Sequence, residues 1–170
     1  VVSNSLLAGY VEVGDRAFIT GNGVVHQFVK IGRLAMLGGA SGVSKDLPPF
    51  CTTKPGTINQ VLGLNVVGMR RAGLGPDERS AVKEAFRIFY RSGLNVSQAL
   101  AQMKPLFPAG PAAEFCAFVE ASPRGICAWC GHLAAPESSS ETLCGLTCHD
   151  QACPESIRRD CLSEHARECE

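Results

Sequence analysis

Residues 1–48 read VVSNSLLAGYVEVGDRAFITGNGVVHQFVKIGRLAMLGGASGVSKDLP, and this stretch decides the fold. An aliphatic side chain returns in it at every sixth position without a miss. The positions are Val1, Leu7, Val13, Ile19, Val25, Ile31, Leu37 and Val43. This period matches neither the roughly 3.6 residues per turn of an α-helix nor the alternation of a single strand. It is typical of a parallel β-helix, in which each hexad supplies one short strand and one corner.

Small residues beside the aliphatic positions fit the same architecture. We expect glycines such as Gly14, Gly32 and Gly38 to supply the tight bends at the corners. Three hexads close one triangular coil, so residues 1–48 supply between two and three coils. A solenoid usually needs at least about three repeats and a cap. Because Val1 is already in register, we expect further coils to precede it.

The pattern changes after the solenoid. Leu47-Pro48-Pro49 predicts its end, because two prolines remove two donors from the strand ladder, and 50–58 is expected to be a loop. Helical patterns follow, each with a start or stop signal such as Asn95 with Gln98, which resembles a capping box. The expected helices span about 61–71, 76–92, 95–103 and 112–121. We therefore predict β-helix coils over 1–49, a helical domain over 50–126 and a separate tail over 127–170.

Composition excludes several classes of function. The formal net charge is zero, which argues against an electrostatic nucleic-acid binder. No apolar run reaches the roughly 18 residues of a membrane helix, so we expect no stable membrane insertion. The charge is distributed unevenly along the chain, since residues 1–126 carry a net charge of +5 and residues 127–170 a net charge of −5. The two segments have different chemistry.

The tail holds seven of the nine cysteines. Cys127-x-x-Cys130-x-His132 and Cys144-x-x-x-Cys148-His149 resemble zinc half-sites, although the spacing of the whole set follows no known module. A disulfide framework would need an oxidising compartment. The third interpretation is a frame-shifted or read-through extension, because the tail has too few apolar residues to offset the entropy of ordering. We favour a disordered extension and assign no metal site.

Several blocks resemble a known family: LLAGYVEVGD, GNGVVHQFVKIG, MLGGASGVSKDLPPF, NVVGMRRAGL and FRIFYRSGLN. They are similar to the UDP-N-acetylglucosamine O-acyltransferases of lipid A biosynthesis, from Val1 to about Ile126. The resemblance implies a left-handed β-helix with a helical domain, assembled as a cytoplasmic homotrimer with active sites between neighbouring β-helices. It also implies transfer of a 3-hydroxyacyl chain from acyl carrier protein to the 3-hydroxyl of UDP-N-acetylglucosamine, the first step of the pathway, without a cofactor.

The resemblance gives roles to residues in the coils. Gly9 matches the glycine whose N–H is proposed to hold the oxyanion of the thioester. Tyr10 replaces a histidine usual in the family's active site, and His26 with Gln27 matches a pair that lines the cleft. Gly39 matches a position where a glycine leaves room for a long acyl chain.

Further roles fall on the first expected helix and beside it. Asn65 and Arg71 match positions that approach the nucleotide sugar, and Arg70 is expected to share this role because Ala72 replaces a second arginine. The same arginines suit the end of a helix dipole. Four cations elsewhere could form a patch for the acidic carrier protein or an ordinary solvated surface. They are Lys30, Arg33, Lys45 and Lys54.

The family's general base is a histidine in an HxxHD block, and no such block occurs in this sequence. By alignment that histidine would lie about one hexad before Val1. We therefore expect a fragment with little activity of its own. The alternatives are a non-catalytic solenoid and the related N-acyltransferase of the same pathway. Zinc-dependent carbonate chemistry would need three histidine ligands, and the coils offer His26 alone.

Overall fold

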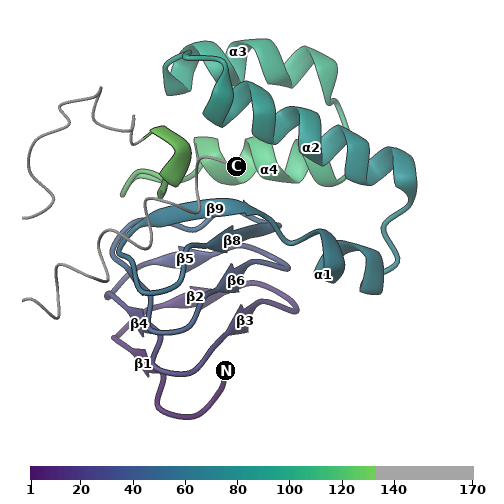
Figure 1. Ribbon diagram of the computed structural model, residues 1–170. Coiled ribbons are helices and arrows are strands. Elements are labelled where there is room, and N and C mark those ends of the chain that lie inside the picture. Colours follow the sequence, from purple (N-terminus) through teal and green to yellow (C-terminus); the bar gives the residue numbers. More distant parts are fainter. Residues whose placement is uncertain (133–170) are drawn as a thin grey trace, which may run out of the picture. The chain divides into compact units, whose positions relative to one another are not determined.

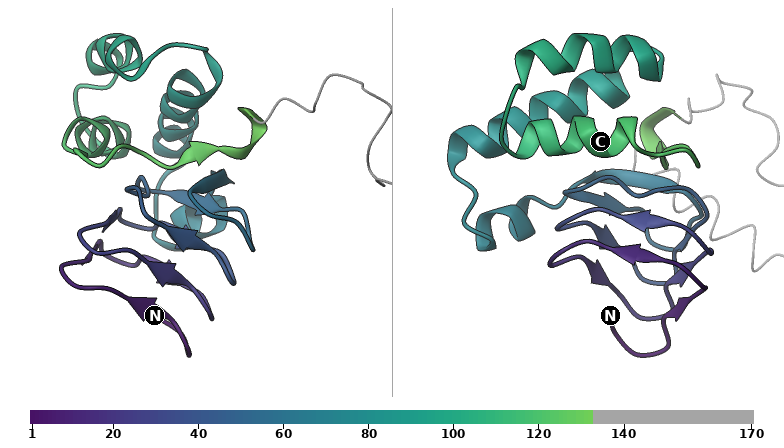
Figure 2. Two further views of the ribbon diagram at one scale, coloured as in Figure 1. Left: turned by 90° about the vertical axis from the view of Figure 1, so that its left-hand side faces the viewer. Right: turned by 180° about the vertical axis from the view of Figure 1, so that it is seen from behind.

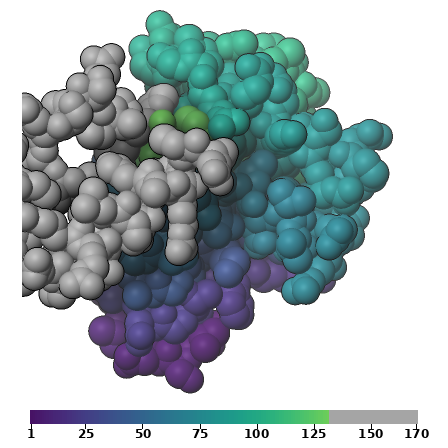
Figure 3. Space-filling model, in the orientation of Figure 1, coloured from purple at the N-terminus to yellow at the C-terminus, as the bar shows by residue number. Residues whose placement is uncertain are grey.

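The computed structural model describes residues 1–132, which form a short β-helix under a layer of helices (Figure 1). The strands of the coils are β1 Leu6–Leu7, β2 Glu12–Val13, β3 Phe18–Ile19, β4 Val24–Val25, β5 Lys30–Ile31, β6 Met36–Leu37, β7 Gly42–Val43 and β8 Cys51–Thr53. From β1 to β7 a strand begins every six residues, as the sequence period predicted, whereas β8 begins nine residues after β7. Figure 3 shows the coils, in purple and blue, below the helices.

Parallel pairing one coil apart stacks the strands into three faces. Face 1 contains β1, β4 and β7, face 2 contains β2 and β5, and face 3 contains β3, β6 and β8. The register is eighteen residues among β1 to β7, since Leu6 pairs with Val24 and Val24 with Gly42, and it shortens to sixteen where Met36 of β6 pairs with Thr52 of β8. The triangular coil predicted from the hexads is therefore confirmed (Figure 2).

The aliphatic positions fill the interior. Ile19, Val25, Ile31 and Leu37 are at most 2% exposed. Leu7 in the first coil is 37% exposed, because only one side of it is covered by a described coil. The stacked aliphatic residues thus form the core that the period predicted.

The corners depart from the expected use of glycine. In each of seven corners one non-glycine residue has positive φ, in the left-handed region. These residues are Asn4, Tyr10, Arg16, Asn22, Phe28, Leu34 and Ala40. The corner glycines serve a different purpose, because a Cβ on Gly32 would lie 2.3 Å from Pro49 N and one on Gly38 would lie 2.9 Å from Thr53 O. In these seven corners glycine is thus required where two coils approach closely, and not for the residue with positive φ.

Two expectations about the end of the solenoid are wrong. Pro48 and Pro49 do not end the solenoid, because within 50–58, expected to be a loop, β8 continues face 3 by pairing with β6. Residues expected to begin a helix at Val61 instead form β9 Gln60–Leu64, antiparallel to β8. Because one edge of β8 is free, these residues form main-chain hydrogen bonds with it as a strand, which they could not do as a helix.

The remaining helices follow the prediction closely. They are α1 Val66–Arg71, α2 Pro76–Arg91, α3 Val96–Leu106 and α4 Pro111–Glu120. The Asn95–Gln98 capping box opens α3 as predicted. Phe115 of α4, Ile88 of α2 and Met103 of α3 are buried where these helices pack together. No helix in residues 1–132 is long and apolar enough to span a membrane.

The chain returns to the coils after α4 and anchors the helical layer. β10 Ala128–Trp129 pairs with β9, and Cys127, which the sequence analysis placed in the tail, is fully buried. Tyr90 of α2 donates its hydroxyl to Cys127 O at 2.9 Å. The thiol of Cys127 donates to Lys45 O at 3.4 Å. Residues 133–170 of the predicted tail, with its disorder and read-through interpretations, lie outside the described residues.

Burial in this anchor shifts three ionisable groups. It raises the pKa of the Cys127 thiol to about 12, with a smaller contribution from the charge of Asp46. Burial also raises the pKa of Cys51 and of Tyr90 well above their ordinary values. All three groups are therefore neutral in the fold at physiological pH.

Close approach of the coils should make Gly32 intolerant of a side chain. Gly32→Ala should lower the free energy of unfolding by about 1–3 kcal/mol, because backbone atoms of Pro49 must shift. Gly39→Ala is the matched control, since its Cβ would meet nothing closer than Thr20 Oγ1 at 3.8 Å. Urea unfolding of both variants checks this, and equal effects would contradict the close-packing role.

The buried thiols and phenol should make the fold sensitive to alkali. The free energy of unfolding should be constant below about pH 9 and fall as the pH rises towards 12, since only the unfolded chain releases these protons there. Each group contributes at most about 1.4 kcal/mol per pH unit. Cys127→Ala should reduce this slope, whereas Cys130→Ala should not. Equal slopes in both variants would contradict the assignment.

Candidate active-site face

Face 1 presents an exposed apolar stripe. Its outward positions are Leu6, Val24 and Gly42, and Ile58 continues the stripe by bridging to Gly42. Leu6 is 62% exposed, Val24 48% and Ile58 71%. Residues 38–41 and 54–57 border the stripe at one corner, and residues 8–11, 26–29 and 44–45 border it at the other.

The second of these corners brings four predicted site residues together, and we call it the histidine corner. Gly9 and Tyr10 lie one coil below His26 and Gln27. A main-chain hydrogen bond joins the two coils here, since Gly9 O accepts from Phe28 N at 3.1 Å. The rings of Tyr10 and Phe28 are stacked, with centroids 5.1 Å apart and planes 9° from parallel. Tyr10 is 81% exposed, so its ring lies largely in solvent at this corner.

Arg124 is a further residue of the histidine corner that the sequence analysis missed. It lies in the loop after α4, and its Nη2 is 3.3 Å from Nδ1 of His26. Nε and Nη2 of Arg124 both donate to Ser44 O at 3.3 Å. Ninety-eight positions separate Arg124 from His26. No spacing or motif in the chain links residues so far apart.

Gly39 lies at the other edge of the apolar stripe. It is exposed, and an added Cβ would only touch Thr20 Oγ1 at 3.8 Å and Gly21 O at 4.0 Å. A side chain at Gly39 would therefore extend over the surface without disturbing the coils. This is compatible with the predicted role of Gly39 in leaving room for a long acyl chain.

Asn65, Arg70 and Arg71 lie far from face 1, on α1 and beside it at the corner between faces 2 and 3 (Figure 1). Asn65 Nδ2 donates to Leu34 O at 2.9 Å, and its Oδ1 accepts from Gly68 N at 2.9 Å. This side chain thus caps α1 and attaches it to the coils. Arg70 and Arg71 are exposed in the last turn of α1. The structure does not bring these residues to His26 within one chain.

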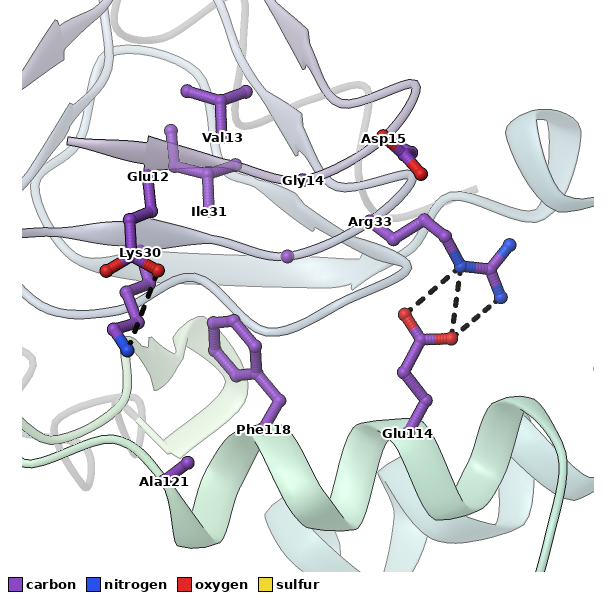
Figure 4. Close-up of a pocket in the computed structure, with 11 residues that line it drawn as sticks. Glu12, Val13, Gly14, Asp15, Lys30, Ile31, Arg33, Glu114, Phe118 and Ala121 are labelled. Atoms are coloured by element: carbon purple, nitrogen blue, oxygen red, sulfur yellow. Dashed lines mark hydrogen bonds and ion pairs between the residues drawn. The ribbon is translucent and has the colours of Figure 1, made fainter.

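Face 2 carries a groove of about 430 Å³ under α4, and it contains none of the predicted site residues (Figure 4). Four of its charged side chains form two ion pairs. Lys30 Nζ lies 3.6 Å from Glu12, and Arg33 donates to both carboxylate oxygens of Glu114 at 2.8–3.1 Å. The Glu114 carboxylate raises the pKa of Arg33. Of the predicted cationic patch, Lys30 and Arg33 are therefore engaged in ion pairs on face 2.

Within residues 1–132, no cluster of three His, Cys, Asp or Glu side chains could hold a metal ion. Cys127, the first member of the possible zinc half-site, is committed to the buried anchor. The second half-site, Cys144 to His149, lies outside the described residues.

Comparison with known proteins shows which family the chain resembles. Residues 46–127 match the family model described as UDP N-acetylglucosamine O-acyltransferase, domain 2. An acyl-[acyl-carrier-protein]–UDP-N-acetylglucosamine O-acyltransferase of Burkholderia orbicola is 43% identical over 129 residues, covering 73% of this chain and 49% of the relative. One of Burkholderia vietnamiensis is 46% identical with the same coverage. The chain thus spans about half the length of the curated relatives it matches.

Solved structures agree with the sequence matches. The UDP-N-acetylglucosamine acyltransferase of Francisella novicida superposes with a TM-score of 0.67 at 30% identity, covering 74% of this chain and 46% of that one. The enzyme from Campylobacter jejuni gives a TM-score of 0.67 at 32% identity, covering 73% and 48%. The solenoid is thus the left-handed β-helix that the resemblance implied. Over these matched residues, the chain belongs to the UDP-N-acetylglucosamine O-acyltransferase family.

Proposed function

We propose that face 1 binds the acyl chain in a transfer from acyl carrier protein to the 3-hydroxyl of UDP-N-acetylglucosamine. The observation that supports this proposal is the sequence of polar, apolar and unobstructed regions across face 1. Gly9, His26 and Gln27 provide polar groups at one corner, apolar side chains follow, and Gly39 leaves the far corner open. A thioester could react at the polar end while its hydrocarbon tail covers the stripe.

The distribution of the site residues favours a complete site between copies of the chain. Asn65 and Arg71 lie on the side opposite face 1, so one copy cannot present all groups to one substrate. A repeated head-to-tail contact that closes after three copies would place α1 of one chain against face 1 of the next. It would also cover Leu6 and Val24, which a single chain leaves in water. We therefore propose the homotrimer.

The relatives named above are O-acyltransferases, which favours oxygen as the acceptor atom over the nitrogen of the related enzyme. The sequence holds no HxxHD block, so we expect this chain alone to bind substrates but transfer acyl groups slowly. General-base catalysis contributes typically about 10²- to 10⁴-fold. Rates from the isolated chain near those of an intact relative would contradict this.

Chain-length dependence tests the proposed role of face 1. The dissociation constant of 3-hydroxyacyl carrier protein should fall as the acyl chain lengthens, by at most about fourfold per methylene. Gly39→Met should abolish the gain for the longest chains and keep it for short ones, because its side chain fills the end of the stripe. Calorimetric titration with a series of acyl lengths measures this.

Gly63→Met is the matched control, since Gly63 lies on β9, outside face 1, and its Cβ would meet no atom within 4 Å. It should leave the length profile unchanged. An unchanged profile in Gly39→Met as well would show that the acyl chain does not reach this corner.

Self-association should depend on the apolar stripe. Val24→Lys should shift the chain from trimer to monomer, because a charge would be buried in the contact. Ser97→Lys on the exposed surface of α3 should leave the mass unchanged. Light scattering coupled to size exclusion distinguishes these outcomes, and a trimeric Val24→Lys variant would exclude face 1 from the contact.

A further inference from the structure

Two groups beside the His26 imidazole require opposite protonation states of its Nδ1 atom. Nδ1 lies 3.3 Å from Nη2 of Arg124 and 3.2 Å from the carbonyl oxygen of Gln27. A guanidinium is always protonated and only donates hydrogen bonds, whereas a carbonyl oxygen only accepts them. Nδ1 must therefore be unprotonated to accept a hydrogen bond from Arg124 and must carry a proton to donate one to the carbonyl oxygen of Gln27.

The guanidinium of Arg124 is held by more than the imidazole. Two of its nitrogens donate to Ser44 O. The main chain next to it is anchored on the same corner, since Asp46 N donates to Gly125 O and Cys127 N donates to Asp46 O, both at 3.0 Å. The position from which Arg124 reaches His26 is thus fixed by main-chain hydrogen bonds that do not involve the imidazole.

The pairing with Arg124 is also the stronger of the two. A hydrogen bond with one charged partner is roughly twice as strong as a neutral one. A proton on Nδ1 would in addition point one N–H group at another. We infer that Arg124 is a positioning residue that holds His26 as the neutral tautomer with its proton on Nε2.

This tautomer decides what His26 can offer a ligand. Because Nδ1 is occupied by Arg124, the remaining ring atom is Nε2, and it carries a hydrogen. His26 therefore donates a hydrogen bond to an oxygen of the substrate and does not take a proton from the attacking hydroxyl. The identity of that substrate rests on the proposed function, whereas the tautomer does not.

Nitrogen NMR of the full chain tests the tautomer directly. Spectra are recorded at about pH 8.5, above the ordinary titration range of imidazole, and His26 is assigned by the signals lost in His26→Gln. We expect Nδ1 of His26 to resonate as an unprotonated ring nitrogen and Nε2 as a protonated one. A protonated Nδ1 in the unmodified chain would overturn the inference without any variant.

Variants of Arg124 identify the cause. Arg124→Met keeps the length of the side chain and removes its donors, so the Nδ1 signal should move towards the protonated position as Gln27 becomes the partner. Arg124→Lys retains a donor and should keep the original pattern. Arg16→Met, at an exposed position of another corner, is the matched control. An unchanged Nδ1 signal in a folded Arg124→Met variant would overturn the assignment to Arg124.

Binding of UDP-N-acetylglucosamine separates the inference from the proposed function. Arg124→Met should weaken binding by about 2- to 10-fold, the value of one hydrogen bond. If the unmodified chain does not bind the nucleotide sugar while the NMR pattern holds, the proposed function fails and the tautomer stands. If the sugar binds equally well to both proteins, the role of Nε2–H in binding is wrong.

Discussion

The rest of the structure depends on main-chain hydrogen bonding between one coil and the next. Leu6 N donates to Gly23 O at 2.8 Å, and Val24 N donates to Ser41 O at 2.9 Å, so the bonds repeat up the solenoid. Coils at this spacing, about 4.8 Å, leave room inside only for stacked aliphatic side chains. They also exclude even a methyl group where backbones meet, as at Gly32 against Pro49.

The same constraint decides where functional groups can lie. Most strands are two residues long and place one side chain inward and one outward, so each face offers a single outward row. Corners repeat in register, which stacks Tyr10 under Phe28 and places His26 near Ser44 of the next coil. An apolar row bordered by polar corners follows from this geometry, and it is the arrangement that an acyl chain with a polar reactive end requires.

A segment that follows the last helix, far along the chain from the coils, contributes residues to this surface. After α4, residues 124–129 return to the coils, where Cys127 and β10 form main-chain hydrogen bonds and the Arg124 side chain reaches the histidine corner. The same segment joins α2 to the solenoid through Tyr90. Residues 124–129 therefore link the stability of the buried anchor to the tautomer inferred for His26.

The sequence by itself determined the coil architecture and most helices, because hydrophobic period and caps such as Asn95–Gln98 are local signals. It also indicated the family. It misassigned residues 61–64 of β9 as helical, because that choice depends on the free edge of β8. Only the tertiary structure showed that Arg124 meets His26 and that Asn65 lies on the opposite side of the coils. Such relations depend on how distant segments pack, and neither period nor spacing along the chain carries that information.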